Sequence, residues 1–155
     1  MSFAQNKRSI EMFVEEYFNK GNYGVKDQLF ALDFVDRTPM FDLPGTSLGL
    51  EQAIKTLRAA FPDQRVKVDE ILPIGEDAAV ARFTIQATHS GPFGTLPPTG
   101  KRVSYSGVAL MRFAPDGRGK ELWIYRDDVA LFKQIGLLPA IAPISMKEQP
   151  AQPTR

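Results

Sequence analysis

Hydrophobic residues in the first part of the chain follow a helical period. They occupy the i, i+3, i+4, i+7 and i+8 positions of one helix face, at Ile10, Phe13, Val14, Tyr17 and Phe18. Gly21 follows Lys20 directly, and a glycine in this place commonly ends a helix. The pattern therefore predicts a helix over residues 6–20.

Two more helices are expected before residue 62. A short one is predicted over residues 25–32, with a buried side made of Leu29, Phe30 and Leu32. The stretch DFVDRTP then reads as a short extended segment that stops at Pro39. A third helix is predicted by apolar residues at helical spacing, capped by Thr46 or Ser47 and ended by Pro62; its apolar residues are Leu50, Ile54, Leu57 and Phe61.

After residue 62 the hydrophobic period changes from 3.6 to 2, which indicates β-strands. Strands are predicted over residues 65–74, 78–89, 101–114 and 121–127. Lengths of ten residues or more suggest bent or bulged strands that wrap around something. A last helical piece is expected near residues 129–135, and the proline-rich residues 139–155 are expected to be extended or disordered.

This order of elements predicts one α+β domain over residues 1–138. Helices come first and antiparallel strands follow, so the helices should pack against one face of the sheet. The expected architecture is a cone-shaped, strongly curved mixed or antiparallel sheet with about three N-terminal helices on its concave face. Such a cone encloses an interior.

Composition narrows the possible functions. The 155 residues are 43% hydrophobic and 24% charged, and 19 Lys and Arg face 18 Asp and Glu, which leaves a net charge of +1. This balance gives no reason to expect nucleic acid or an anionic membrane as a partner, and it suits a small hydrophobic ligand. No apolar stretch is long enough to span a bilayer, and the N-terminus lacks the apolar core of a secretory signal, so a cytoplasmic protein is expected.

The chain has no cysteine and one histidine, which restricts the chemistry further. Disulfides, a thiol nucleophile, thiolate metal sites and multi-histidine metal sites are excluded. No metal and no cofactor are expected.

The single histidine, His89, leads into an unusual loop, SGPFGTLPPTG. Glycines allow backbone conformations closed to other residues, and prolines stiffen the chain between them, so a defined lid is expected rather than a flexible connector. Phe93 and Leu96 would form its apolar underside. The alternative is that this loop seals one end of the core or packs on a second subunit.

Four stretches, taken in order and spacing, resemble the SnoaL-like polyketide cyclases of the nuclear transport factor 2-like superfamily: NKGNYGVKDQLFALDFVD, LRAAFPDQRVKV, THSGPFGTLPPTGKRVSYSG and ELWIYRD. The resemblance implies a cone-shaped fold, dimerisation through the convex face of the sheet, and ring closure of a polyketide ester by aldol chemistry without a cofactor. It places the family's acidic residue at Asp127, within the ExWxxxD pattern of Glu121, Trp123 and Asp127. Arg37 stands where many relatives carry a histidine.

Strand alternation offers an independent hypothesis for the site. Trp123, Tyr125 and Asp127 share one side of their strand, and His89 continues an apolar row of its own strand. If both rows face the interior, these residues line one pocket, with the side chains of Phe18, Arg37, Phe93 and Leu96 also contributing. Burial among aromatic rings would raise the pKa of Asp127, which would make it the general acid, with His89 as its assistant.

Simpler roles for these residues remain open. Asp127 has the sequence position of a helix cap, and His89 has the type and place of a residue that holds a loop to the backbone. The alternatives to a cyclase are a non-catalytic binding module for a hydrophobic metabolite and an epoxide-hydrolase-like enzyme. The hydrolase needs two carboxylates and an arginine, and these residue types are offered, without a recognisable spacing, by Asp36, Arg37, Arg82 and Asp127. Apolar residues on both sides of the strand at 101–114 predict a homodimer.

Overall fold

The computed structural model describes residues 2–138, and the predicted tail at 139–155 lies outside the described residues. The chain runs through helices α1 (Phe3–Met12), η1 (Phe13–Asn19), η2 (Tyr23–Val25), α2 (Lys26–Leu29), α3 (Ser47–Ala60) and α4 (Asp128–Ile135). The strands are β1 (Phe30–Asp36), β2 (Arg65–Ile74), β3 (Ala78–Thr88), β4 (Arg102–Phe113) and β5 (Gly119–Arg126). No helix in the described part of the chain is long and apolar enough to cross a membrane.

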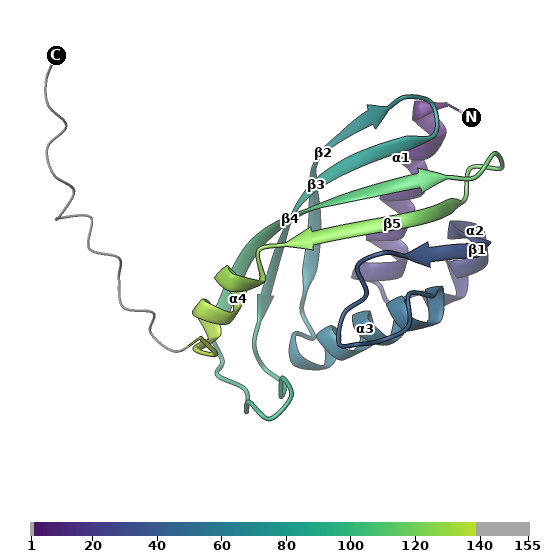
Figure 1. The fold of residues 1–155 in the computed structure, drawn as a ribbon. Helices are drawn as coiled ribbons and strands as arrows, with labels where there is room; N and C mark the ends of the chain where they lie inside the picture. The colour runs from purple at the N-terminus through teal and green to yellow at the C-terminus, as the bar shows by residue number, and fades with distance from the viewer. Residues whose placement is uncertain (1, 139–155) are drawn as a thin grey trace, which may run out of the picture.

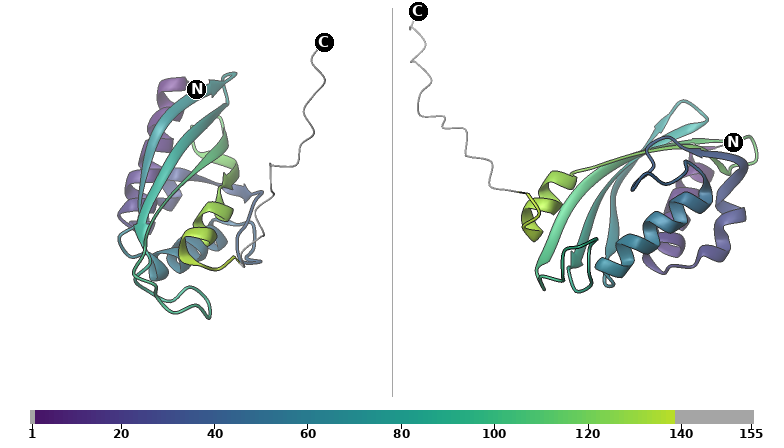
Figure 2. Two further views of the ribbon diagram at one scale, coloured as in Figure 1. Left: turned by 90° about the vertical axis from the view of Figure 1, so that its left-hand side faces the viewer. Right: turned by 60° about the horizontal axis from the view of Figure 1, so that its bottom comes forward.

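The strands form one five-stranded sheet in the order β1-β5-β4-β3-β2. All neighbours are antiparallel except β1, which runs parallel to β5. Helices α1 and α3 lie against one face of this sheet, and the long strands curve over them (Figures 1 and 2). The predicted α+β class, with a curved mixed sheet covered by N-terminal helices, is confirmed.

Alternation along the strands places one apolar row on the helix-covered face. In β3 and β4 the buried residues alternate with more exposed ones. The buried residues of β3 lie opposite those of β4 in the register of the two strands. The residues of this buried row are Ala81, Phe83, Ile85, Ala87, Val103, Tyr105 and Met111. Hydrophobic burial on this single face holds the helices to the sheet.

The first helix differs from its prediction in its internal geometry. It begins at Phe3, where the Ser2 side chain caps it, and from Phe13 it widens into a π-helical segment whose last hydrogen bond joins Lys20 N–H to the carbonyl of Glu15 at 3.0 Å. Gly21 ends the helix as predicted, with a φ of 67° that favours glycine. Segments of π-helix commonly occur at functional sites.

The second predicted helix is confirmed at Lys26–Leu29 and wrong at residues 30–32. Only Lys26–Leu29 are α-helical, and Phe30 already belongs to β1. Leu32, which was expected to be buried, is 97% exposed. The short apolar run fits both periods, and pairing with β5 selects the strand. The third helix is confirmed, since Thr46 caps it by accepting a hydrogen bond from Gly49 N–H at 3.1 Å.

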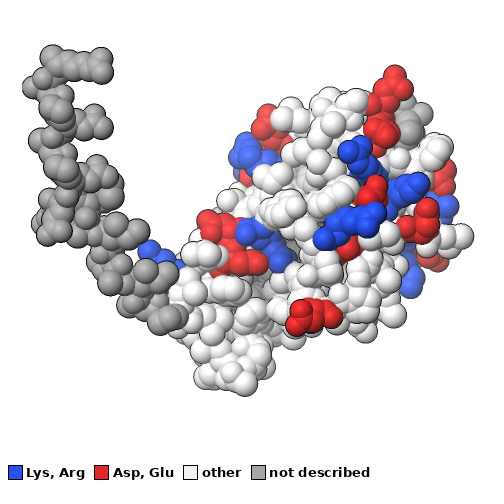
Figure 3. All heavy atoms as spheres, in the orientation of Figure 1, with Lys and Arg blue, Asp and Glu red and all other residues white. Residues whose placement is uncertain are grey.

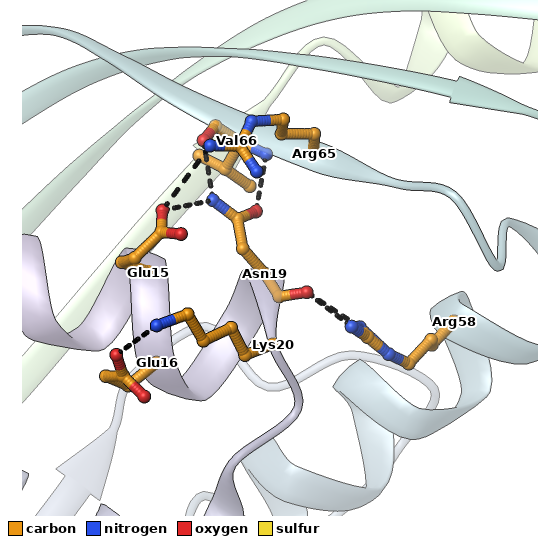
Figure 4. Close-up of polar contacts among 7 residues, drawn as sticks. All are labelled: Glu15, Glu16, Asn19, Lys20, Arg58, Arg65 and Val66. Atoms are coloured by element: carbon orange, nitrogen blue, oxygen red, sulfur yellow. Dashed lines mark hydrogen bonds and ion pairs between the residues drawn. The ribbon is translucent and has the colours of Figure 1, made fainter.

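A side-chain amide joins the end of η1 to the outer edge of β2. Asn19 Oδ1 accepts a hydrogen bond from Val66 N–H at 2.8 Å, and its Nδ2 donates to the Val66 carbonyl at 3.0 Å (Figure 4). The carbonyl of Asn19 in turn accepts from Arg58 of α3, with Nη1 at 3.2 Å. Asn19 thus satisfies edge-strand backbone groups and ties both helices to the sheet.

We expect Asn19→Ala to lower the free energy of unfolding by about 1–3 kcal/mol, because the edge groups of Val66 lose both partners. Urea denaturation measures this change. Asn22→Ala is the matched control, since Asn22 is exposed and its side chain makes one long hydrogen bond, 3.4 Å to the Glu16 side chain. The effect of this variant on the free energy of unfolding should stay within about 0.5 kcal/mol. Equal losses in both variants would contradict the role given to Asn19.

Candidate functional site

A cavity of about 70 Å³ lies between the helices and the buried face of the sheet. Its walls are almost entirely apolar and come from α1, η1, α3 and every strand. Examples of these lining residues are Phe13, Phe18, Leu57, Phe83, Met111 and Ile124. Three polar side chains interrupt this lining: Asp36, Thr38 and Arg126. An apolar cavity with a few convergent polar groups is the usual form of a small-molecule site.

Asp36 reaches the cavity because it is the last residue of β1. Alternation along that strand turns Phe34 and Asp36 inward, and Asp36 lies opposite Leu122 of β5. Its backbone N–H donates to the carbonyl of Gly45 at 3.0 Å, so the chain that leaves β1 returns to the same point. A side chain at position 45 would collide with the carbonyl of Asp36, which explains the glycine.

The carboxyl of Asp36 is held by its own neighbour in the chain. Oδ1 accepts a hydrogen bond from Thr38 N–H at 2.9 Å, and the Thr38 hydroxyl lies 3.4 Å from the same oxygen. Thr38 is fixed in turn, because its Oγ1 accepts from Ile124 N–H of β5 at 2.8 Å. One carboxyl oxygen is thereby oriented by the backbone, and Oδ2 has no such partner.

Burial sets the protonation behaviour of this carboxyl. Asp36 is 5% exposed, and desolvation raises its pKa above the ordinary value for aspartate. The hydrogen bonds from Thr38 and the charge of Arg126 lower the pKa and offset part of this effect. The group can therefore both hold and release a proton closer to neutral pH than an exposed aspartate can.

Arg126 brings a positive charge to the same cavity from the end of β5. Its side chain is 12% exposed, and Nε lies 3.4 Å from Oδ1 of Asp128. That contact lacks hydrogen-bond geometry, so the buried Nε–H has no hydrogen-bond partner. Tyr105 lies within the influence of this charge; burial raises the Tyr105 pKa to about 12, and Arg126 works against the rise.

Asp127 lies outside the cavity. Its side chain caps α4, where Oδ1 accepts a hydrogen bond from Ala130 N–H at 3.0 Å, and the residue is exposed. Its own N–H donates to the carbonyl of Ser106 at 2.9 Å. The structure therefore gives Asp127 the position of a helix cap, the second of the two roles considered from the sequence.

Trp123 and Tyr125 share the side of β5 that carries Asp127, and that side faces away from the cavity. Tyr125 is 65% exposed. The cavity receives the alternate residues of this strand, Leu122, Ile124 and Arg126. The hypothesis placed the Trp123 row toward the interior, whereas in the structure this row lies on the outer side of the strand. Alternation shows which residues share a side, and it does not show which side is covered.

His89 belongs to a separate cluster at the far end of the sheet. It is fully buried, and Nδ1 lies 2.9 Å from the Thr99 hydroxyl and accepts from Thr99 N–H at 3.2 Å. The imidazole ring packs on Phe61 at a centroid distance of 5.3 Å, and Phe93 follows at 5.9 Å from Phe61. His89 therefore fixes the β3–β4 loop and does not line the cavity.

The other predicted site residues divide between these places. Phe18 lines the cavity. Phe93 and Leu96 form an isolated β-bridge within the β3–β4 loop, whose residues 90–100 carry no charge and appear white at the bottom of Figure 3. Arg37 points outward and pairs with Glu121, with Nη2 2.9 Å from Oε2. On the face drawn in Figure 3 acidic and basic side chains are interspersed.

The sequence prediction did not place Asp36, Thr38 or Arg126 in the pocket, and considered Asp36 only for the hydrolase alternative. The signal for Asp36 was present, since a lone carboxylate follows Phe34 at strand spacing. No group of three or more His, Asp or Glu side chains within residues 2–138 is arranged to hold a metal ion.

The comparisons with known proteins agree with the fold described above. The chain matches the family model for SnoaL-like polyketide cyclase over residues 8–135. AclR from Streptomyces galilaeus, a proposed hydroxylase, is 29% identical, and the similarity covers 89% of this chain and 100% of AclR with a TM-score of 0.77. IdmH from Streptomyces antibioticus, a proposed polyketide cyclase, is 31% identical over 85% of this chain and 99% of IdmH, with a TM-score of 0.75. No curated protein matches the chain.

The raised pKa of Asp36 predicts a distinct pH dependence of stability. A carboxyl whose pKa is higher in the folded state than in the unfolded state loses its contribution as pH rises from the unfolded value, about 3.9, through the folded value. Asp36→Asn removes this loss, so the variant should gain stability relative to the wild type between pH 4 and pH 8. Thermal unfolding across that range measures the difference.

Asp63→Asn is the control with the opposite sign. Thr88 N–H donates to Asp63 Oδ1 at 2.7 Å, and this hydrogen bond lowers the pKa of Asp63. Its contribution is present above the unfolded pKa and is lost as pH falls through the folded one, so this variant should be weakest relative to the wild type at neutral pH. The same sign in both variants would contradict the environment described for Asp36.

Proposed function

The chain belongs to the SnoaL-like polyketide cyclase family, and from this premise we propose that it is an enzyme that closes a ring in an apolar carbonyl compound by aldol-type acid–base chemistry, with Asp36 as the proton-transfer group. One observation carries the proposal: a buried carboxyl with one oriented oxygen faces an otherwise apolar cavity. The match to IdmH, a proposed polyketide cyclase, supports the same reaction class.

The chemistry requires a base and an acid in succession. The Asp36 carboxylate takes a proton from a carbon between two carbonyls, and the enolate carbon then forms a bond to a third carbonyl of the same molecule. The protonated Asp36 returns its proton to the alkoxide that this bond creates. A raised pKa suits both steps, because the group must accept and donate at one pH.

Orientation supplies the rest of the rate. The reacting carbons belong to one flexible molecule, and an apolar cavity can hold them together in a single folded arrangement. Well-oriented intramolecular reactions gain roughly 7–11 kcal/mol from such positioning. Thr38 serves as the positioning residue, since its N–H fixes the carboxyl of Asp36 and its hydroxyl binds β5.

We assign Asp127 a supporting role. It lies between the last residue of β5, Arg126, and the first residue of α4, so its cap fixes the backbone next to Arg126. In this proposal the acidic residue of the family's ExWxxxD pattern shapes the site from outside, and Asp36 performs the proton transfer within it.

Substrate access requires part of the wall to move. A cavity of about 70 Å³ is smaller than the ~300–1,000 Å³ of typical ligand pockets. Residues 37–46 cover it through Thr38 and Met40, and Phe41 and Asp42 there have left-handed φ values of 55° and 56°. Such backbone strain costs about 1–3 kcal/mol per residue, which favours this segment as the part that opens.

The β3–β4 loop would guide this opening. The ring of Phe41 lies 6.2 Å from that of Phe93, and Phe93 also packs 6.2 Å from Phe132 of α4. We propose that Phe93 and Leu96 form the apolar rim that the substrate passes, and that His89 anchors the rim through Thr99. The catalytic assistance expected of His89 has no support from its position.

A second candidate is hydrolysis, in which two carboxylates and an arginine activate a water. Arg126 favours it in part, because it pairs with Asp128 and acts on Asp36. The third candidate, a binding module without catalysis, needs the cavity but not the carboxyl. AclR, which is similar to this chain, is a proposed hydroxylase, so hydroxylation is a further candidate reaction.

Nonane-2,4,8-trione tests the proposal, because its carbon 3 can attack carbonyl 8 to form a six-membered ring. We expect the wild type to accelerate this closure, followed by proton NMR, and Asp36→Asn to lower the enzymatic rate by roughly 10²–10⁴-fold. Asp127→Asn should keep a rate near that of the wild type, because asparagine also caps helices.

The two aspartate variants separate the candidates. Loss of activity in Asp127→Asn with retention in Asp36→Asn would overturn the assignment of Asp36. A wild-type rate equal to the rate in buffer would favour the binding module.

We also propose that two copies of the chain associate through the outer face of the sheet. Four apolar residues lie in one row across four strands on this face: Leu72, Val80, Leu110 and Trp123. Val108 and Tyr125, in the next row, are 40% and 65% exposed. A sheet face that stays in water is ordinarily polar, and a contiguous apolar row marks an interface. A second copy suits it, because a row crossing the sheet can pair with itself around a two-fold axis.

We expect the wild type to have the mass of a dimer in light scattering at micromolar concentration, and Leu110→Arg to have the mass of a monomer, because an arginine there would bury an unpaired charge. Leu48→Arg is the control. Leu48 is 55% exposed on α3, on the other side of the sheet, so this variant should remain dimeric. A monomeric wild type would overturn the proposal.

A further inference from the structure

Arg126 places a cation inside a cavity that otherwise suits a neutral apolar molecule. Among the cavity's lining residues in the described part of the chain, it is the only basic side chain and Asp36 the only acidic one. The remaining lining, apart from Thr38, is apolar. An arginine in this position needs a partner, because a buried charge without one is strongly destabilising.

The acidic side chains of the protein satisfy Arg126 only in part. Asp128 lies on the solvent side, with its side chain 39% exposed, and its Oδ1 is 3.4 Å from Nε without hydrogen-bond geometry. Asp36 contributes through space, but the hydrogen bonds of its carboxyl group come from Thr38. The Tyr105 phenol is a neutral neighbour, since its raised pKa keeps the proton on it at physiological pH. The buried Nε–H of Arg126 therefore remains free to donate.

We propose that Arg126 is the oxyanion-binding residue of this cavity, and that the ligand is an apolar compound with a negatively charged oxygen. This inference rests on the proposed function in one respect: it takes the enolate formed by Asp36 as the oxyanion during reaction. A carboxylate group also presents a negatively charged oxygen, and it is stable where an enolate is not. The planar guanidinium suits both, because it donates parallel hydrogen bonds to oxygens in one plane.

The position of Arg126 also fits a role in the reaction. Asp36 ends β1 and pairs with Leu122 of the parallel strand β5, and Arg126 lies four residues further along β5, with both residues lining the cavity. One side chain can thus receive the proton while the other receives the negative charge that the proton leaves behind. Preorganised donors in a dry cavity stabilise such charge far better than water does.

Benzoate and benzamide provide a matched pair of probes, because they have nearly the same shape and differ in charge. We expect the wild type to bind benzoate at least about tenfold more tightly than benzamide in NMR titrations at low salt, as a charge-assisted hydrogen bond predicts. Arg126→Gln should abolish this preference. Arg126→Lys should keep part of it, because the charge remains but the planar fork is lost.

Two further variants complete the experiment. Arg112→Gln is the control for charge, since Arg112 is exposed on β4 with the outward-facing residues, and it should keep the preference. Asp36→Asn should strengthen the preference, because it removes the acidic side chain that repels benzoate from the cavity lining. Each variant's circular dichroism spectrum checks that it is folded.

Equal binding of the two probes by the wild type, no binding of benzoate, or a preference that survives Arg126→Gln would overturn the inference. In those cases the proposed cyclase activity still stands if Asp36→Asn loses ring closure. If Asp36→Asn retains ring closure while Arg126→Gln loses the preference for benzoate, the anion site stands and the role of Asp36 fails.

Discussion

The structure depends on covering one face of a curved sheet with helices that do not curve with it. Hydrophobic burial holds α1, η1 and α3 against the inner side of β2 to β5, with Phe13, Tyr17 and Leu57 among the side chains removed from water. Because the strands bend and the helices do not (Figure 2), the two surfaces leave a space between them. The buried carboxyl of Asp36 and the unbonded Nε–H of Arg126 both lie beside that space.

Much of the fold could be predicted from hydrophobic spacing, because one-sided burial leaves a strong period in the sequence. The strand at Arg65–Ile74 and the cap of α3 at Thr46 agree with their predictions. The prediction was wrong at residues 30–32, because the apolar run at residues 29–32 fits either period. There the hydrogen bonds of β1 with β5, which join residues far apart in the chain, decide the structure.

The site was harder to predict, because alternation alone does not show which side of a strand is covered. In β5 both rows are partly apolar: Leu122 and Ile124 face the cavity, and Trp123 belongs to the apolar row on the outer face. The aromatic row looked more like a pocket than the aliphatic one. The inward position of Asp36 depends on β1 lying beside β5, a neighbour that no local pattern in the sequence reveals.

The parallel pairing of β1 with β5 also bears on how the protein is made. Thr38, which holds Asp36, is fixed by a backbone group 86 residues later in the chain, at Ile124. Contacts at such separations carry a large loop-closure entropy, and they form late compared with hairpins such as β3 and β4. During synthesis on a ribosome, β1 emerges early, but its partner strand β5 is made only after most of the domain. Asp36 and Thr38 are therefore synthesised early, but their contacts with β5 form only at the end of synthesis, so a partly made chain lacks this side of the cavity.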